Sequence, residues 1–108
     1  MDIPEIDVEE LERHLTGGAP VFDVREPDEY RSAHIPGATL VPLATVPDTV
    51  ETFEVAGATT YVVCAKGGRS ARAVEFLRAR GIDAVNVAGG TGAWIKAGKP
   101  TVAGDRPG

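Results

Sequence analysis

Short apolar runs alternate with segments of helical periodicity along the whole 108-residue chain. The run TYVVC is continuous, β-branched and aromatic, which is typical of a strand buried on both faces. Pro42 would remove a ladder hydrogen bond from a central strand, so its run is expected at a sheet edge. The predicted strands are IPEI, PVFDV, TLVPL, TYVVC and DAVNV, at 3–6, 20–24, 39–43, 60–64 and 83–87.

The segments between these runs have the spacing of amphipathic helices. Asp7 with Glu10 predicts a capping box, Pro27 suits the first turn of a brief helix, and Ser70 is expected to cap the helix that follows it. Strands alternating with helices predict an α/β fold of three layers, α/β/α, with a parallel sheet of about five strands. The helical segments are 8–15, 26–33, a weak one at 47–55, 70–80, and a short one around Trp94.

Length and composition indicate a single domain spanning residues 1–108, with a frayed, flexible tail at 103–108. No apolar stretch is long enough to cross a bilayer. The opening MDIPEIDVEE is acidic and lacks the basic and apolar regions of a signal peptide, so we expect a cytoplasmic protein that acts away from membranes.

Charge is distributed unevenly along the chain. The net charge is −5, which argues against a nucleic-acid partner. Residues 1–60 carry 13 acidic and 3 basic side chains, whereas residues 61–108 carry 3 acidic and 8 basic ones. The asymmetry fits a solvated surface, because sequence halves interleave in an α/β fold. It also fits a local field that attracts small anions.

The single cysteine, Cys64, ends a predicted strand, where sites form in parallel sheets. It can be buried filler, a reactive thiol or an intermolecular partner, and with two scattered histidines it makes no zinc site. Gly67 and Gly68 allow a nest of N–H groups that binds an anion, and Lys66 and Arg69 would favour a thiolate. The alternative is a plain buried cysteine before a glycine-rich turn.

Three segments together resemble the rhodanese family. DVREPDEYRSAHIPGA (23–38) resembles its first signature, CAKGGRS (64–70) its active-site loop, and GGTGAWIKAGKP (89–100) its closing motif. The matches fall in family order and place a rhodanese-like core at about 4–102. One departure, Ala88 where leucine is common, looks like a packing change.

The resemblance implies sulfur transfer without a metal or organic cofactor. Cys64 would take a sulfane sulfur from thiosulfate or a persulfide donor and pass it to cyanide or a cellular thiol. A sulfur-acceptor protein is another possible partner. The donor would be bound by the active-site loop, in which Lys66 and Arg69 attract the anion and backbone N–H groups hold the persulfide. The loop residues are Ala65, Lys66, Gly67, Gly68, Arg69 and Ser70.

Two other functions compete with this interpretation. Cysteine-dependent phosphatases also use a Cys-to-Arg anion loop, with five intervening residues, whereas four stand between Cys64 and Arg69. A rhodanese-like sulfur carrier or interaction module acting with a partner protein is the second alternative. The presence of Cys64 with both basic loop residues argues for activity.

Other conspicuous residues are expected to be structural. Arg25 with Glu29 fits an ion pair that holds the next turn, and a structural role is expected for Asp23 as well. A turn-stabilising hydrogen bond is expected for His34 in preference to a general base. Trp94 is expected in the core.

Overall fold

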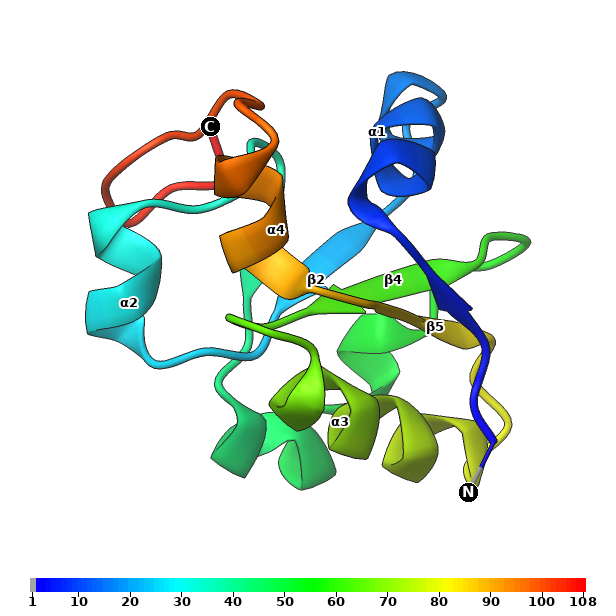
Figure 1. Ribbon diagram of the computed structural model, residues 1–108. Helices are drawn as coiled ribbons and strands as arrows, with labels where there is room; N and C mark the ends of the chain where they lie inside the picture. Colours follow the sequence, from blue (N-terminus) through cyan, green and yellow to red (C-terminus); the bar gives the residue numbers. More distant parts are fainter. Residues whose placement is uncertain (1) are drawn as a thin grey trace.

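A computed structural model describes residues 2–108 and contains one sheet of five strands, all parallel (Figure 1). The strand order is β1-β5-β4-β2-β3, so the predicted edge position of β3 is confirmed. β2 and β4 are neighbours in the middle of the sheet, with Phe22 opposite Val62. The strands are β1 (Glu5–Ile6), β2 (Val21–Asp23), β3 (Thr39–Leu40), β4 (Thr60–Val63) and β5 (Ala84–Val87).

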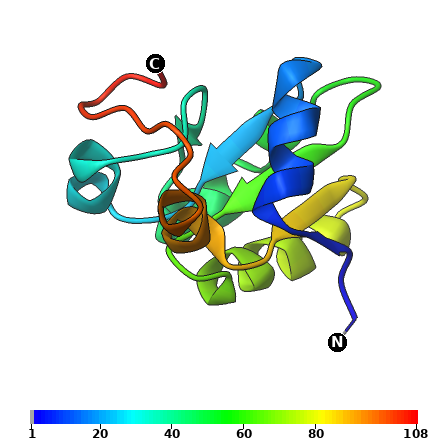
Figure 2. The same cartoon turned by 45° about the horizontal axis from the view of Figure 1, so that its top comes forward.

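Helices cover both faces of the sheet and create two cores (Figures 1 and 2). One face holds α3 (Gly68–Arg78) and two 3-10 helices, η1 (Leu43–Asp48) and η2 (Val50–Phe53). The other face holds α1 (Val8–Thr16), α2 (Pro27–Ser32) and α4 (Gly90–Lys96). Alternate residues of the central strands serve the two cores, which confirms the three-layer prediction.

Local sequence explains how several helices begin. The Asp7 carboxylate accepts the Glu10 N–H at 2.9 Å, which confirms Asp7 as the cap of α1. Glu26 and Glu29 form a reciprocal capping box around Pro27 at the start of α2. The weak helix expected at 47–55 is instead η1 and η2. The two 3-10 helices are separated at Thr49, whose φ of −133° and ψ of +30° are not helical, so the segment does not form one continuous α-helix.

The last residues lie against α2 in both views (Figures 1 and 2). Val102 and His34 form an antiparallel bridge. The Gly104 N–H donates to the Arg31 carbonyl at 2.9 Å, and the Gly37 N–H donates to the Pro107 carbonyl at 2.8 Å. This docked arrangement differs from the frayed end that composition suggested, because the partners come from residues 31–37. Within residues 2–108, no helix combines the length and apolarity needed to cross a bilayer.

Candidate active site

Cys64 lies where β4 ends, at the carboxyl edge of the sheet, and α3 begins four residues later. The residue is only 1% exposed and belongs to the core between the sheet and α3. Gly67 has φ +112° and serves as the N-cap of α3. That left-handed conformation, which favours glycine, turns the chain from the strand into the helix above the thiol.

The Cys64 sulfur accepts hydrogen bonds from its own loop. The Gly67 N–H lies 3.1 Å from Sγ, and the Ser70 hydroxyl donates to Sγ at 3.3 Å. Ser70 is buried inside the first turn of α3, so the prediction that it caps this helix is wrong. Gly67 takes the cap position, which frees the serine hydroxyl to contact the sulfur.

These contacts favour the thiolate. Burial raises the pKa of Cys64. Hydrogen bonds from the Ser70 hydroxyl and from the N–H groups of Ser70, Gly67 and Lys66 lower the pKa by more than burial raises it, so it lies below its ordinary value. The lowered pKa agrees with the expected activation. Its cause is hydrogen bonding to the loop, whereas the sequence also suggested the charges of Lys66 and Arg69.

The N-terminal turn of α4 supports the loop from the side. The Thr91 N–H donates to the Cys64 carbonyl at 2.8 Å, and the Gly92 N–H donates to the Ala65 carbonyl at 2.9 Å. At Gly90, with φ +58°, an added Cβ would stand 2.4 Å from the Cys64 carbonyl oxygen. The two backbones therefore approach so closely that only glycine fits at this position.

Asn86 of β5 provides a second support. Its Nδ2 donates to the Glu5 carboxylate at 2.7 Å and to the Gly67 carbonyl at 3.3 Å. Sequence analysis missed both this role and the close approach at Gly90. A buried amide inside the apolar run DAVNV was the available signal, because a buried polar side chain needs partners.

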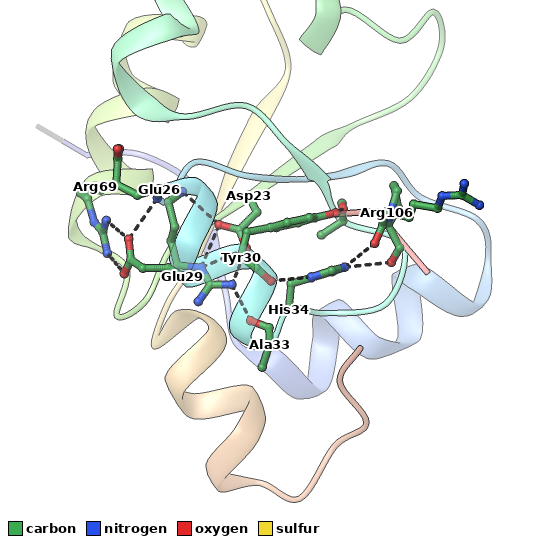
Figure 3. Close-up of polar contacts among 11 residues, drawn as sticks. Asp23, Glu26, Glu29, Tyr30, Ala33, His34, Arg69 and Arg106 are labelled. Carbon is green, nitrogen blue, oxygen red and sulfur yellow. Dashed lines mark hydrogen bonds and ion pairs between the residues drawn. The ribbon is translucent and has the colours of Figure 1, made fainter. Parts of the chain in front are cut away.

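Arg69 points toward α2 and pairs with Glu29 (Figure 3). The two guanidinium nitrogens donate to the two carboxylate oxygens at 2.8 and 3.0 Å. Arg25 pairs instead with buried Asp23 at 2.8 Å and donates to the Ala33 carbonyl. The expected Arg25–Glu29 pair is therefore wrong, because Asp23 lies beside Arg25 while β2 brings α2 close to the β4 loop. Lys66 is exposed.

The remaining conspicuous side chains are structural. His34 is buried, with Nδ1 2.8 Å from the Tyr30 carbonyl and Nε2 2.8 Å from the Arg106 carbonyl (Figure 3). Its ring thus joins α2 to the tail. The expected hydrogen bond from His34 to the turn at residues 35–37 is replaced by these two contacts. Trp94 is buried, as predicted, and its indole N–H donates to the Pro100 carbonyl.

Comparisons with known proteins agree with this geometry. Residues 7–97 match the rhodanese-like domain. A rhodanese-related protein from Thermoplasma volcanium superposes with a TM-score of 0.85 at 34% identity, covering 92% of this chain and 97% of that one. The putative sulfurtransferase YtwF of Bacillus subtilis is 30% identical over 93% of this chain and 98% of its own length. The thiosulfate sulfurtransferase GlpE of Pseudomonas entomophila is 36% identical over 71% of each.

Some relatives are considerably longer. The chain spans 46% of an uncharacterized Synechocystis protein to which it is 37% identical over 76% of its own length. It also spans 51% of the putative sulfur carrier protein YrkF of Bacillus subtilis, at 33% identity over 85% of this chain.

Proposed function

Because the chain belongs to the rhodanese-like domain family, we propose that it is a sulfurtransferase that carries a sulfane sulfur as a persulfide on Cys64. The observation that carries the proposal is the Cys64 sulfur itself, which accepts hydrogen bonds from the Gly67 N–H and the Ser70 hydroxyl. Those donors stabilise a thiolate and would stabilise the anionic outer sulfur of a persulfide in the same way. Relatives named as sulfurtransferases support the reaction class.

The first half-reaction loads the cysteine. The Cys64 thiolate attacks the sulfane sulfur of thiosulfate and forms a new S–S bond, while the sulfane–sulfonate S–S bond breaks and its electron pair leaves with sulfite. The product is a Cys64 persulfide anion, and total charge is conserved. A hydropersulfide, R–S–SH, would react at its outer sulfur and release R–S⁻.

The second half-reaction unloads the sulfur onto an external acceptor. Cyanide attacks the outer sulfur and leaves as thiocyanate, which restores the Cys64 thiolate. Because the sequence holds one cysteine, no second thiol of the chain can resolve the persulfide to an internal disulfide. A cellular thiol or a partner protein would therefore take the sulfur in vivo, and the name of YrkF makes a carrier role the second candidate.

Intact-protein mass spectrometry tests the proposal directly. Thiosulfate or a hydropersulfide should add one sulfur atom to the wild-type protein, and cyanide should remove it with thiocyanate as product. Cys64→Ser should abolish both steps. Sulfur loading or thiocyanate formation that persists in this variant would place the reaction elsewhere, and the absence of loading from every donor would refute the proposal.

Hydrolysis of aryl phosphates separates the proposal from a phosphatase. Four residues stand between Cys64 and Arg69, which makes a smaller ring than the phosphatase loops have. Cys64 is almost completely buried, which leaves more room for the single outer sulfur of a persulfide than for a bulkier phosphoryl group. We therefore expect negligible phosphatase activity, and robust hydrolysis that depends on Cys64 would favour the phosphatase instead.

A further inference from the structure

Two nitrogens of the Arg69 guanidinium are engaged by a carboxylate from another element. Nη1 and Nη2 of Arg69 donate to Oε1 and Oε2 of Glu29 at 2.8 and 3.0 Å, and Figure 3 shows the Glu29 side chain reaching across from α2. A bidentate pair of this kind is more directional than a simple ionic contact. This pairing competes with the binding of an anionic sulfur donor, which is the role that the loop resemblance implies for Arg69.

Glu29 is itself held in place. Its Oε1 accepts the Glu26 N–H at 3.0 Å within the capping box of α2. The hydrogen bonds to Arg69 and to the Glu26 N–H, together with the positive charges of Arg69 and Arg25, lower the pKa of Glu29 to about 2, so it is ionised at neutral pH. The carboxylate does not have to be recruited when a donor arrives, because it already faces Arg69.

The charges around the loop therefore cancel in pairs. Asp23 pairs with Arg25, and Glu29 pairs with Arg69. Lys66 is exposed, and within residues 2–108 it joins no salt bridge. An incoming donor would meet one unpaired cation at this loop, whereas sequence alone suggested two.

We propose that Glu29 is a specificity-determining positioning residue that withholds the charge of Arg69 from the donor, so that Cys64 takes sulfur more readily from an organic hydropersulfide than from the thiosulfate dianion. The inference rests on the proposed sulfur transfer. In the loading step the Cys64 thiolate attacks the outer sulfur of R–S–SH, the donor S–S bond breaks, and R–S⁻ leaves with the electron pair while the proton stays on the transferred sulfur.

The physical reason is competition between two anions for one cation. Thiosulfate carries two negative charges and must displace Glu29 from Arg69, or approach a neutral pair, before it gains from that guanidinium. The protonated R–S–SH form, which the Cys64 thiolate attacks, has no charge on the reacting sulfur and loses nothing when Arg69 is occupied. The Gly67 N–H and the Ser70 hydroxyl donate to the Cys64 sulfur itself, which is the nucleophile in both loading reactions.

Glu29→Gln tests the inference, with Asp28→Asn as its matched control. Glutamine retains an oxygen for the Glu26 N–H but removes the charge opposing Arg69. Asp28 is an exposed neighbour on α2, and its substitution makes the same change of net charge without touching Arg69. The measurement is kcat/KM for thiosulfate and for cysteine hydropersulfide, each with cyanide as acceptor, at low and high salt.

Wild type should use the hydropersulfide more efficiently than thiosulfate. Glu29→Gln should raise kcat/KM for thiosulfate about tenfold at low salt, mainly through KM, because one charge facing a dianion at this partly exposed site has an effect of that order. The gain should shrink at high salt, as screening predicts. The hydropersulfide reaction and the Asp28→Asn variant should change little.

A second background shows whether Glu29 acts through Arg69. In the Arg69→Gln protein, adding Glu29→Gln should raise thiosulfate use by less than it does in the wild type, because only the repulsion between the Glu29 carboxylate and the dianion is left to relieve. An equal gain in both backgrounds would show that Glu29 acts on the dianion directly and would overturn the inference. Glu29→Asp, which keeps the charge in case the glutamine variant folds poorly, should stay nearer the wild-type donor ratio.

Three other results would overturn the inference and leave the proposed function intact. They are a wild type that prefers thiosulfate, a Glu29→Gln variant whose two donor reactions fall together, and an equal effect of Asp28→Asn. Failure of Cys64 to load from either donor would instead refute the sulfurtransferase proposal itself.

Discussion

At the scale of single residues, the lowered pKa of Cys64 depends on hydrogen-bond donors from residues 66–70. The sulfur is buried, which by itself opposes the thiolate, and the Ser70 hydroxyl is the first of the groups that reverse this effect. A buried group is charged only when its surroundings replace the water it has lost. The cationic side chains nearby point elsewhere, because Arg69 is paired with Glu29 and Lys66 is exposed.

Ser70→Ala should therefore make Cys64 less acidic. In the wild-type protein, the alkylation rate plotted against pH should have its midpoint below the free-thiol value of about 8.5. Because a lowered pKa extends the thiolate to lower pH, losing one hydrogen bond to the charged form should raise the midpoint by about one pH unit. Ser32→Ala, at an exposed serine of α2, is the control. Unchanged midpoints in both variants would show that the Ser70 hydroxyl does not lower the pKa of Cys64.

At the scale of elements, residues 64–70, which we propose as the active-site loop, lie between three elements. β4 delivers Cys64, α3 supplies Ser70, and the first turn of α4 donates two backbone N–H groups to the carbonyls of Cys64 and Ala65. The loop itself is short and carries two glycines, so its shape depends on these neighbours. The glycines of α4 are as much a part of the site as those of the loop.

Gly90→Ala should test the contact between α4 and the loop, with Gly98→Ala as its control. Both glycines have positive φ, +58° and +75°, but a Cβ at Gly98 meets no atom within 4 Å. Gly98→Ala should cost about 1 kcal/mol of unfolding free energy from backbone strain alone. Gly90→Ala adds a clash with the Cys64 carbonyl and should cost at least about 2 kcal/mol and slow sulfur loading. Equal losses of unfolding free energy in the two variants, measured by urea denaturation, would show that the loop backbone can shift to accommodate a Cβ at position 90.

At the scale of the whole molecule, the C-terminal end of the sequence reaches the region around α2 (Figure 1). The tail pairs with His34, Arg31 and Gly37, and it covers the end of the signature segment that carries Glu29. Since His34 is buried, with its Nε2 2.8 Å from the Arg106 carbonyl, the tail provides a partner that water would otherwise have to supply.

Removing residues 103–108 should destabilise the protein by about 1–3 kcal/mol, the cost of leaving a buried polar group without its partner. Thermal or urea unfolding measures the loss. Asp105→Asn, which breaks only the exposed Arg31–Asp105 pair, should change stability by less than about 1 kcal/mol. A truncated protein as stable as the full chain would show that the tail contributes nothing and would agree with a flexible end.

Local patterns in the sequence determined the layer architecture and the position of Cys64 at the end of β4, because strand runs, glycine breaks and motif spacing are properties of neighbouring residues. The hydrogen bonds that lower the pKa of Cys64 also arise within seven residues, although the role of Ser70 in them depended on where α3 begins. Tertiary structure alone decided the partner of Arg69, since Glu29 lies 40 residues earlier and meets it only because β2 and β4 are adjacent. The same holds for Asn86 at the loop and for the tail at His34, whose partners lie 19 and 72 residues away. Side-chain pairing over such separations follows from which strands and helices are neighbours in space, and no local pattern records it.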